Sequence, residues 1–192
     1  LAMLLGVALG LVAGYWGGVI DGVVMRVSDV FLSFPRLVLA MAIAASLGAG
    51  LINGMIAVAL SWWPWYARLV RSQMLSLKQA DFVTAASSIG ASHGRIIMRH
   101  LLPNIIGLIA VQSSLDLGYA ILFTASLSII GLGAQPPTPE WGAMISQGRK
   151  NMLTHWWYPT FPGLAIFVAV LGANLFGDTL RDILDPRLRH TV

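Results

Sequence analysis

Long intervals without a charged residue constrain this chain more than any other feature. No Asp, Glu, Lys or Arg occurs in residues 1–20 or between Leu37 and Ala67. An ionised side chain at the centre of a bilayer costs about 2.5–3.5 kcal/mol even on lenient insertion scales, so such intervals indicate membrane helices. Of all residues, 57% are hydrophobic and only 10% are charged, which is unlike an ordinary soluble domain. The sequence therefore predicts an all-α membrane protein.

The uncharged intervals predict about five membrane spans. The stretch 37–67 is too long for one crossing of a roughly 30 Å hydrocarbon core, at about 1.5 Å per residue. The glycines of LGAGLINGM at 47–55 supply a turn inside it. Asp116 is the single charged residue of the fourth span. We place the spans at about 1–20, 36–49, 52–68, 104–131 and 157–177.

The basic residues predict the orientation of these spans. If 69–103 lies in the cytoplasm, ten of the twelve Lys and Arg lie inside, and only Arg149 and Lys150 lie outside. The Trp-rich stretches SWWPWYAR at 61–68 and HWWYP at 155–159 then fall at opposite ends of their spans, where aromatic rings anchor. Apolar residues at helical spacing in 20–34 predict a surface or gate helix on the inner side.

Composition and motifs argue against several function classes. The chain has no cysteine, which excludes disulfides, a Cys-ligated zinc site and a thiol nucleophile. His93 and His100 are seven residues apart, about 10 Å along a helix, which is too far to share a metal ion. His155 and His190 have no partner at ligand spacing. The net charge of +4 comes without an aromatic-rich basic patch, so we expect no nucleic-acid binding, and we expect no metal, catalytic residue or cofactor.

The stretch AASSIGASHGRIIMRHLLPN at 85–104 interrupts the apolar pattern. We expect Gly90 to end a helix, Ser92 to cap a second one, and Pro103 to stop the second helix before the fourth span. The result would be two short helices outside the bilayer, held at an angle by one small residue. The apolar stripe of the first helix consists of Leu75, Phe82, Ala86 and Ile89.

This stretch has the features of a docking element. Small side chains at Ala85, Ala86 and Gly90 would let another surface approach the backbone closely. Arg95 and Arg99, four residues apart, would form a basic edge for an acidic partner or for lipid headgroups. The alternative is an amphipathic loop that lies on the membrane, in which the small residues are incidental. The residues alone leave both interpretations open.

The segment TAASSIGASHGRIIMRHLLP at 84–103 resembles the cytoplasmic signature of bacterial ABC-importer permeases. That signature is Glu-Ala-Ala, three residues, Gly, nine residues, then Ile-x-Leu-Pro. Thr84 stands where the signature has Glu, His100 stands where Ile is usual, and Asp81 is a neighbouring acid that could substitute for the Glu. The matching positions are Ala85, Ala86, Gly90, Leu102 and Pro103.

Other stretches extend the resemblance over almost the whole chain. Together they are similar to the second permease subunit of the dipeptide, oligopeptide and nickel branch. Such subunits begin with an additional membrane helix, so we expect an N-terminal helix to be missing here. The stretches are GLVAGYWGGVID at 10–21, MRVSDVFLSFP at 25–35, WYARLVRSQMLSLK at 65–78, IIGLGAQPPTPEWGAMI at 129–145 and FPGLAIFVAVLGANLFGDTLRDILDPRLR at 161–189.

The resemblance implies a type I ABC-importer permease fold in the bacterial inner membrane. One permease domain, 1–192, would carry a cytoplasmic coupling segment at about 72–103. Its partners would be a second permease subunit, two cytoplasmic ATPase subunits that hold ATP and Mg, and a periplasmic or lipid-anchored substrate-binding protein. This chain has no G-x-x-x-x-G-K-[ST] loop, so the partners would hydrolyse the ATP. The implied ATPase-coupling residues are Thr84, Ala85, Ala86, Gly90, Arg95, Leu102 and Pro103.

Two further sites leave alternatives open. Asp116 would contact a cationic group of the cargo or position water in the translocation path. Alternatively, it would fix helix packing through partners such as Ser113 or Ser114, or through the second permease. Glu140 and Trp141 begin a predicted short external helix. That helix would dock the binding protein or cover the mouth of the cavity.

The C-terminal stretch 177–189 mixes acidic and basic residues on the inner side. Arg181 and Asp185 are four residues apart, which predicts a modest stabilising pair on one helix face. The stretch, which also contains Arg187 and Arg189, would close the helix bundle or touch the ATPase.

An importer permease for peptides is the leading interpretation, with nickel chelates, glutathione-like molecules and sugars as alternative cargo. An ion-gradient-driven transporter is the main alternative function, but such carriers usually show inverted repeats and several ionisable residues within their spans. A membrane-embedded hydrolase would need a catalytic pair there. The predicted spans contain Asp116 as their one acid, which disfavours both alternatives.

Overall fold

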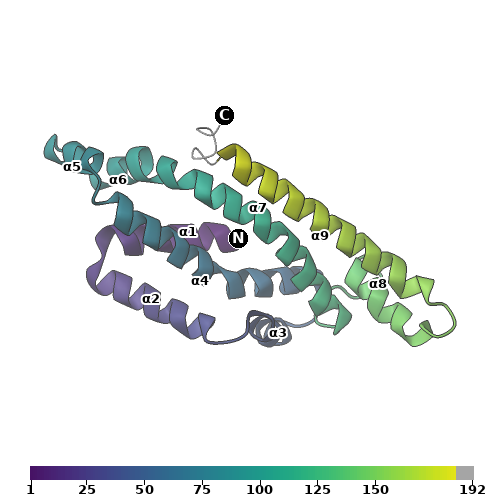
Figure 1. The fold of residues 1–192 in the computed structure, drawn as a ribbon. Coiled ribbons are helices and arrows are strands. Elements are labelled where there is room, and N and C mark those ends of the chain that lie inside the picture. Colours follow the sequence, from purple (N-terminus) through teal and green to yellow (C-terminus); the bar gives the residue numbers. More distant parts are fainter. Residues whose placement is uncertain (185–192) are drawn as a thin grey trace. The chain divides into compact units, whose positions relative to one another are not determined.

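The computed structural model describes residues 1–184, and every regular element in that range is a helix. Figure 1 shows their arrangement along the chain, with η1 a π-helical turn and η2 a 3-10 turn. The predicted all-α fold is confirmed. The elements are α1 (Ala2–Trp16), α2 (Gly18–Leu32), α3 (Arg36–Leu47), α4 (Leu51–Leu77), α5 (Asp81–Ser88), α6 (His93–Ile96), η1 (Ile97–Leu101), α7 (Leu102–Ile129), α8 (Trp141–Gly148), η2 (Arg149–Asn151) and α9 (Trp157–Leu184).

The predicted turn inside 37–67 lies between α3 and α4. Gly48 has a φ of +89°, in the left-handed region that L residues with a side chain rarely adopt. The Asn53 side-chain amide donates hydrogen bonds to the carbonyl oxygens of Leu47 and Gly48, at 3.0 and 3.1 Å. These bonds satisfy carbonyls that the end of α3 leaves without a helical partner.

Length and apolarity identify fewer spans than the uncharged intervals did. Within residues 1–184, the continuous helix His93–Ile129 and the helix Trp157–Ile183 are long and apolar enough to cross a membrane. If α2 and α3 count as one broken span, they make a third. All five predicted spans fall on helices, but α1 has 15 residues and α3 has 12, fewer than the roughly 20 of a full crossing. The predicted surface helix at 20–34 is α2, which therefore also fits as the first part of a broken span.

The described residues pack as two compact units. Unit 1 contains Leu1–Pro35 and Trp62–Ala110, and unit 2 contains Arg36–Ser61 and the chain from Val111 onward. Helices α4 and α7 each contribute one part to unit 1 and one part to unit 2. The prediction of a single permease domain stays a prediction.

In unit 1, α1 packs closely along α4 through three glycines. Gly6, Gly10 and Gly14 recur at every fourth position, on the side of α1 that meets α4. A Cβ at Gly10 would lie 2.6 Å from the Ala67 carbonyl oxygen and 2.8 Å from the Val70 Cβ. Small residues at this spacing let helix backbones approach each other, as they do in membrane helix pairs.

Two ion pairs attach α2 to α4 within the same unit. Asp29 pairs with Arg68 where both side chains are mostly exposed. Asp21 pairs with Arg71 through two nitrogens of the guanidinium, and the Nη2 to Oδ2 distance is 2.6 Å. The Asp21 side chain is only 17% exposed, so this second pair is the better shielded from water.

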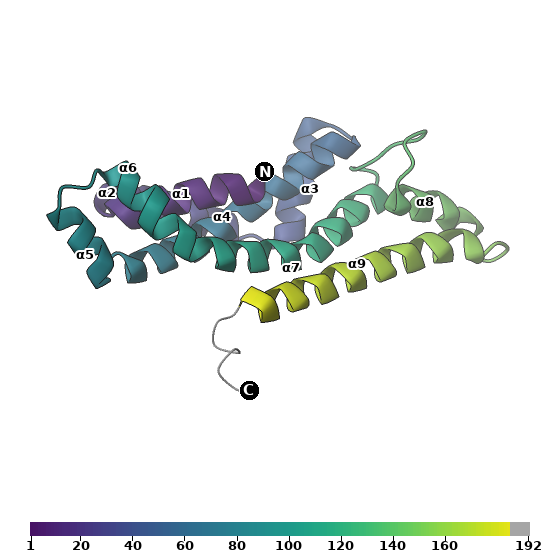
Figure 2. The same ribbon diagram turned by 90° about the horizontal axis from the view of Figure 1, so that it is seen from above.

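In unit 2, α9 packs against α7 at two glycines. A Cβ at Gly118 would lie 2.8 Å from the Asn174 side-chain oxygen, and a Cβ at Gly177 would lie 2.9 Å from a Leu115 methyl. Figures 1 and 2 both show α8 lying alongside the first turns of α9. Close packing therefore fixes which sides of α7 and α9 face each other.

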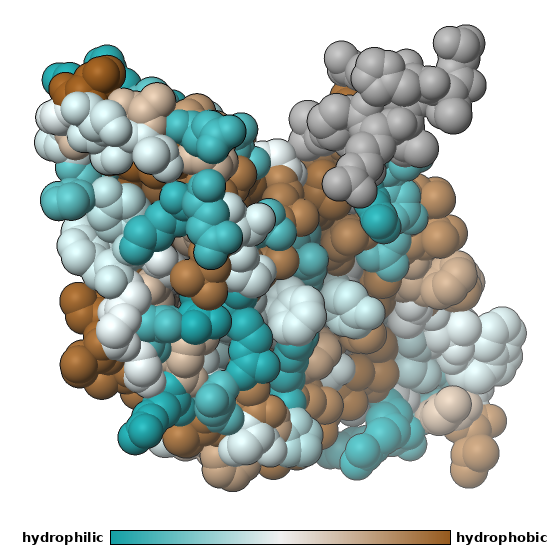
Figure 3. All heavy atoms as spheres, turned by 60° about the vertical axis from the view of Figure 1, so that its left-hand side comes forward, coloured by the Kyte–Doolittle hydropathy of each residue, from teal (hydrophilic) through white to brown (hydrophobic). Residues whose placement is uncertain are grey.

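Apolar side chains cover much of the surface in Figure 3. Exposed apolar side chains in such number are expected of helices that meet lipid or another membrane helix. On α9 alone, the large apolar residues that are more than two-fifths exposed include Phe161, Leu164, Phe167, Val168, Leu171, Leu175 and Phe176.

Candidate functional site

The candidate site is the central module, which we define as residues 78–103. It contains α5, the turn after α5, α6, η1 and the start of α7. All of it belongs to unit 1. Figures 1 and 2 show α5 and α6 beside each other at one end of that unit.

Gly90 ends the α5 segment as the sequence predicts. Its φ is +78°. Its N–H donates to the Ser87 carbonyl at 3.0 Å, and the Ala91 N–H donates to the Ala86 carbonyl at 3.1 Å. These two bonds form a Schellman motif, in which a left-handed residue closes the end of a helix. A side chain at this position would be strained, so Gly90 has a backbone reason to be glycine.

The predicted continuous stripe from Leu75 to Ile89 is wrong. Leu75 belongs to α4, which ends at Leu77, and α5 begins separately at Asp81. The break has a packing reason, because it turns the chain so that Val83 and Ala86 reach the core of unit 1. A single helix running straight through would carry both residues away from α1 and α4.

The expectation that Pro103 stops the second helix is also wrong. The helix is continuous from His93 to Ile129. Directly before the proline, the Leu102 N–H donates to the Ile97 carbonyl, five residues back. Proline has no N–H to donate and its ring needs space near the preceding turn, and the wider π turn supplies that space. The helix therefore continues through the proline.

Ser92 takes the predicted N-cap position of α6, but not by the predicted contact. Its φ of −66° and ψ of 151° are those of a cap, and its carbonyl accepts from the Ile96 N–H at 3.0 Å. The Ser92 hydroxyl makes no capping hydrogen bond to the residues that the structure describes. The backbone alone starts this helix.

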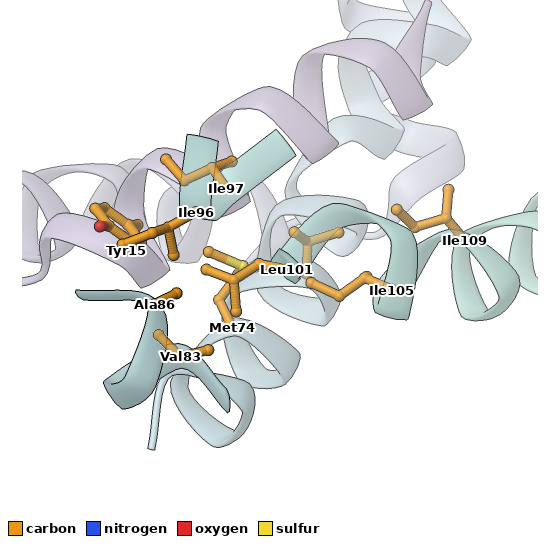
Figure 4. Packing of buried hydrophobic residues seen from close by; sticks show 10 residues of the cluster. Tyr15, Met74, Val83, Ala86, Ile96, Ile97, Leu101, Ile105 and Ile109 are labelled. Carbon is orange, nitrogen blue, oxygen red and sulfur yellow. The ribbon is translucent and has the colours of Figure 1, made fainter. Parts of the chain in front are cut away.

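A buried apolar cluster connects the central module to α1 and α4 (Figure 4). Val83 and Ala86 of α5 are 6% exposed and pack with Met74 of α4 and with Leu101, both fully buried. Ile96 and Ile97 join the cluster from the helix after the turn. Burial of this kind stabilises by roughly 25 cal/mol per Å² of apolar surface. It makes α5 part of one packed body with the end of α4 and the start of α7.

The outer side of α5 is apolar and exposed. Phe82 is 41% exposed and Ile89 is 86% exposed, and Ala85 lies between them on the same side. These residues line a shallow pocket of about 370 Å³ with a basic rim. The pocket is lined by Phe82, Ala85, Ala86, Ile89, Ala91, Arg95 and His100.

The structure separates the remaining predicted coupling residues. Arg95 lines the pocket, whereas Arg99 is exposed outside it. Thr84 is exposed on another side of α5, where its carbonyl accepts bonds from the hydroxyls of Ser87 and Ser88. Leu102 is half-buried against the cluster, and Pro103 is exposed in the first turn of α7.

Sequence reasoning missed Tyr15, which binds the module from α1. Its hydroxyl and His93 Nδ1 share a hydrogen bond of 2.7 Å. The Lys78 ammonium donates to the Tyr15 carbonyl at 2.6 Å and lies 5.5 Å from the centre of the Tyr15 ring. Tyr15 and His93 are 78 positions apart, so no local pattern reveals this contact.

Asp116 lies on α7 and accepts a hydrogen bond of 3.1 Å from the Gln112 side chain, one turn earlier. Of the two serines predicted as alternatives, Ser114 donates to the Val111 carbonyl of its own helix. Gln112 is the partner that the sequence analysis did not name. Its bond to Asp116 lies along one helix, so this bond does not join two helices.

Glu140 begins the predicted external helix, which is α8. Its carboxylate accepts from the Ala143 N–H at 2.8 Å and so caps the helix. Trp141 follows and is 42% exposed. Together with Pro139 and Met144, these two residues line a shallow pocket of about 290 Å³.

Comparison with known proteins decides the family. The model of the family described as binding-protein-dependent transport system inner membrane component matches residues 6–190. The chain belongs to this family. The match takes in every helix from α2 to α9 and most of α1.

Similar members of this permease family come from several bacteria. The chain is 49% identical to the probable D,D-dipeptide transport system permease protein of Escherichia coli strain K12, over 97% of this chain and 63% of that protein. It is 47% identical to the dipeptide transport system permease protein of Alkalihalophilus pseudofirmus, over 98% and 62%. It is 47% identical to the glutathione transport system permease protein of Pectobacterium atrosepticum, over 97% and 62%. The chain thus spans a little under two thirds of the length of these relatives.

The structure describes the chain up to residue 184, so the predicted C-terminal stretch 177–189 is described only in part. Arg181 lies in α9. Its predicted partner Asp185, and also Arg187 and Arg189, lie outside the described residues.

Among residues 1–184, no three His, Asp or Glu side chains stand close enough to hold a metal ion.

Proposed function

We propose that this chain is a permease subunit of an ATP-driven importer, and that α5 is the element that an ATPase subunit moves. The observation that carries the proposal is the exposed apolar side of α5, with Phe82, Ala85 and Ile89, set on a buried core that continues into α7. A surface of this kind suits an apolar groove in a cytoplasmic partner. The basic rim at Arg95 suits a partner with acidic residues.

In this proposal the buried apolar cluster passes the motion of α5 to the start of α7. Val83 and Ala86 pack against Ile96, Ile97 and Leu101, which lie on the continuous helix His93–Ile129. A displacement of α5 therefore moves the start of that helix as part of one packed body, because packed cores deform little. Alternation between inward-facing and outward-facing states would follow from rigid-body motion of the spans.

The proposed partners are those implied by the family. Two ATPase subunits would bind ATP and Mg, a second permease subunit would complete the pathway, and a periplasmic or lipid-anchored binding protein would deliver the cargo from outside. Support comes from the name of the family and from relatives called transport system permease proteins. Glu140 and Trp141, on the short helix α8 beside a shallow pocket, are the proposed contact for the binding protein.

The proposed cargo is a small peptide or a peptide-like molecule. The relatives at 47–49% identity are named for D,D-dipeptide, dipeptide and glutathione transport, and these three cargoes are all peptides or peptide-like. Asp116 is the proposed contact in the translocation path for a cationic group such as a peptide ammonium.

The decisive experiment compares two tryptophan substitutions on α5. Ala85→Trp places a ring in the exposed pocket, whereas Ser87→Trp adds the same ring at an exposed position that does not line the pocket. We expect Ala85→Trp to reduce binding-protein-stimulated ATP hydrolysis by at least about tenfold, since blocking a packed contact costs more than 1.4 kcal/mol. We expect Ser87→Trp to stay close to the wild type.

The assay uses the complete complex in proteoliposomes, first without an ion gradient and then with one imposed. Equal effects of the two variants would contradict a docking role for this side of α5. Uptake by the wild type that ignores ATP but follows an imposed ion gradient would favour the secondary transporter instead. Gly90→Trp is a poorer probe, because its φ of +78° makes any side chain strained and confounds docking with folding.

A further inference from the structure

We propose that Tyr15 is a positioning residue that fixes both ends of the segment 78–93, which contains α5, to α1. A displacement of α5 then also moves α1. This inference rests on the proposed function, because it concerns how motion of α5 is passed on. The docking surface on α5 is a separate feature and does not include Tyr15.

One residue holds the chain on both sides of α5. Lys78, three residues before the helix, donates to the Tyr15 carbonyl at 2.6 Å. His93, five residues after the helix, shares a hydrogen bond of 2.7 Å with the Tyr15 hydroxyl. The segment between these contacts is therefore a loop that is closed at its base by a single side chain and its own carbonyl.

The two contacts are chemically different, and each suits its place. Tyr15 lies in the last turn of α1, where carbonyl groups lack helical partners and the helix dipole favours a cation. The Lys78 ammonium meets both needs there, and it also lies near the face of the ring. The Tyr15 side chain is buried, at 8% exposed, and its ring meets the His93 ring in a T-shaped arrangement.

The backbone on each side of α5 is not helical. The chain leaves helical geometry from Lys78 to Ala80 before α5 and again from Ile89 to Ser92 after it. At Gly90 and Gly94, apart from chain neighbours and the glycine's own helix backbone, no heavy atom among the described residues lies within 4 Å of where a Cβ would be. Such segments turn easily about their backbone bonds, and the Tyr15 contacts hold the end of each that is farther from α5.

The helix α1, which carries Tyr15, is closely packed against α4. Gly14, next to Tyr15, lies so close to α4 that an added Cβ would be 2.5 Å from the Met74 Cβ. The glycine contacts at Gly6 and Gly10 continue this packing along α1. Motion of Tyr15 therefore moves α1 and α4 together, because these two helices are tightly packed.

The test removes the hydroxyl and keeps the ring. Tyr15→Phe loses the bond to His93, whereas Tyr158→Phe removes a hydroxyl in α9, outside the central module. The readout is the number of ATP molecules hydrolysed per substrate imported by the assembled complex. We expect Tyr15→Phe to raise this ratio by about two- to tenfold, the factor that corresponds to one net hydrogen bond. Tyr158→Phe should leave it unchanged.

Substitutions of His93 and Lys78 test the mechanism. His93→Leu should raise the ratio as Tyr15→Phe does, and the double variant should be no worse than either alone, because both remove the same bond. His93→Asn, whose side-chain amide can replace the ring nitrogen, should restore much of the coupling. Lys78→Met should add to the effect of Tyr15→Phe, because it removes the second contact.

Two results would overturn the inference. An unchanged ratio in Tyr15→Phe would show that the hydroxyl transmits nothing. A fall in the melting temperature or in assembly that accounts for the whole loss of transport would show a merely structural role. In either case the wild-type complex would still import with ATP and still respond to Ala85→Trp, so failure of this inference is distinct from failure of the proposed function.

Discussion

Single glycines on α1 set the distance between α1 and α4. Where Gly6, Gly10 and Gly14 face α4, the nearest neighbours include backbone atoms, which cannot rotate away as a flexible side chain can. Gly22 on α2 is the opposite case, because no heavy atom in residues 1–184 outside its chain neighbours and its own helix backbone lies within 4 Å of the place of its Cβ. The same residue type therefore has a packing role in one helix and none in the next.

This contrast gives a prediction at the residue scale. Gly10→Ala should destabilise the protein by about 1–3 kcal/mol, the usual cost of overpacking, because its Cβ would lie 2.6 Å from the Ala67 carbonyl oxygen. Gly22→Ala should be neutral or stabilising by up to about 1 kcal/mol, because alanine is the better helix former. Thermal unfolding in detergent measures both. Equal melting temperatures for the two variants would contradict the close packing.

At the scale of helical elements, the N-cap residues of α6 and α8 begin their helices in different ways. Glu140 accepts a hydrogen bond from the Ala143 N–H and so holds the first turn of α8. Ser92 occupies the same kind of position before α6, yet the capping observed there uses its backbone carbonyl. A residue type that favours capping does not by itself establish that its side chain caps.

The caps give a prediction at this scale. Glu140→Ala should cost about 0.5–2 kcal/mol, the usual worth of a side-chain cap, and should speed hydrogen exchange of the α8 amides. Ser92→Ala should change the exchange of the α6 amides little, because its hydroxyl contributes no capping bond there. Exchange followed by mass spectrometry checks both variants. A larger increase in α6 exchange on Ser92→Ala than in α8 exchange on Glu140→Ala would contradict this assignment.

At the scale of the whole molecule, local rules predicted the elements better than the way they join. The helices α3, α4, α7 and α9 lie where uncharged intervals placed spans, because charge and apolarity act locally. The end of α5 at Gly90 was equally predictable. The path through Pro103 was not, because a wider turn can absorb a proline and the sequence does not show when it will. The same limit hid the contact of Tyr15 with His93, which depends on tertiary packing.

The orientation of the chain in the membrane gives the prediction at this scale. The chain has no cysteine, so single cysteines report their side of the membrane without background. Ser87→Cys should react with an impermeant maleimide only from the cytoplasmic side, and Gln147→Cys, near Arg149 and Lys150, only from outside. Labelling of both positions from the same side would contradict the ten-to-two division of basic residues.

The wide turn at Ile97–Leu101 also fixes how many residues this stretch can contain. It holds one residue more than a regular α-helical turn, since its bond joins positions five apart. Deleting one residue there would leave a regular α-helical turn, which lacks the space that the Pro103 ring takes. Length, more than composition, is therefore the constraint on this stretch, and substitutions should be tolerated where insertions and deletions are not.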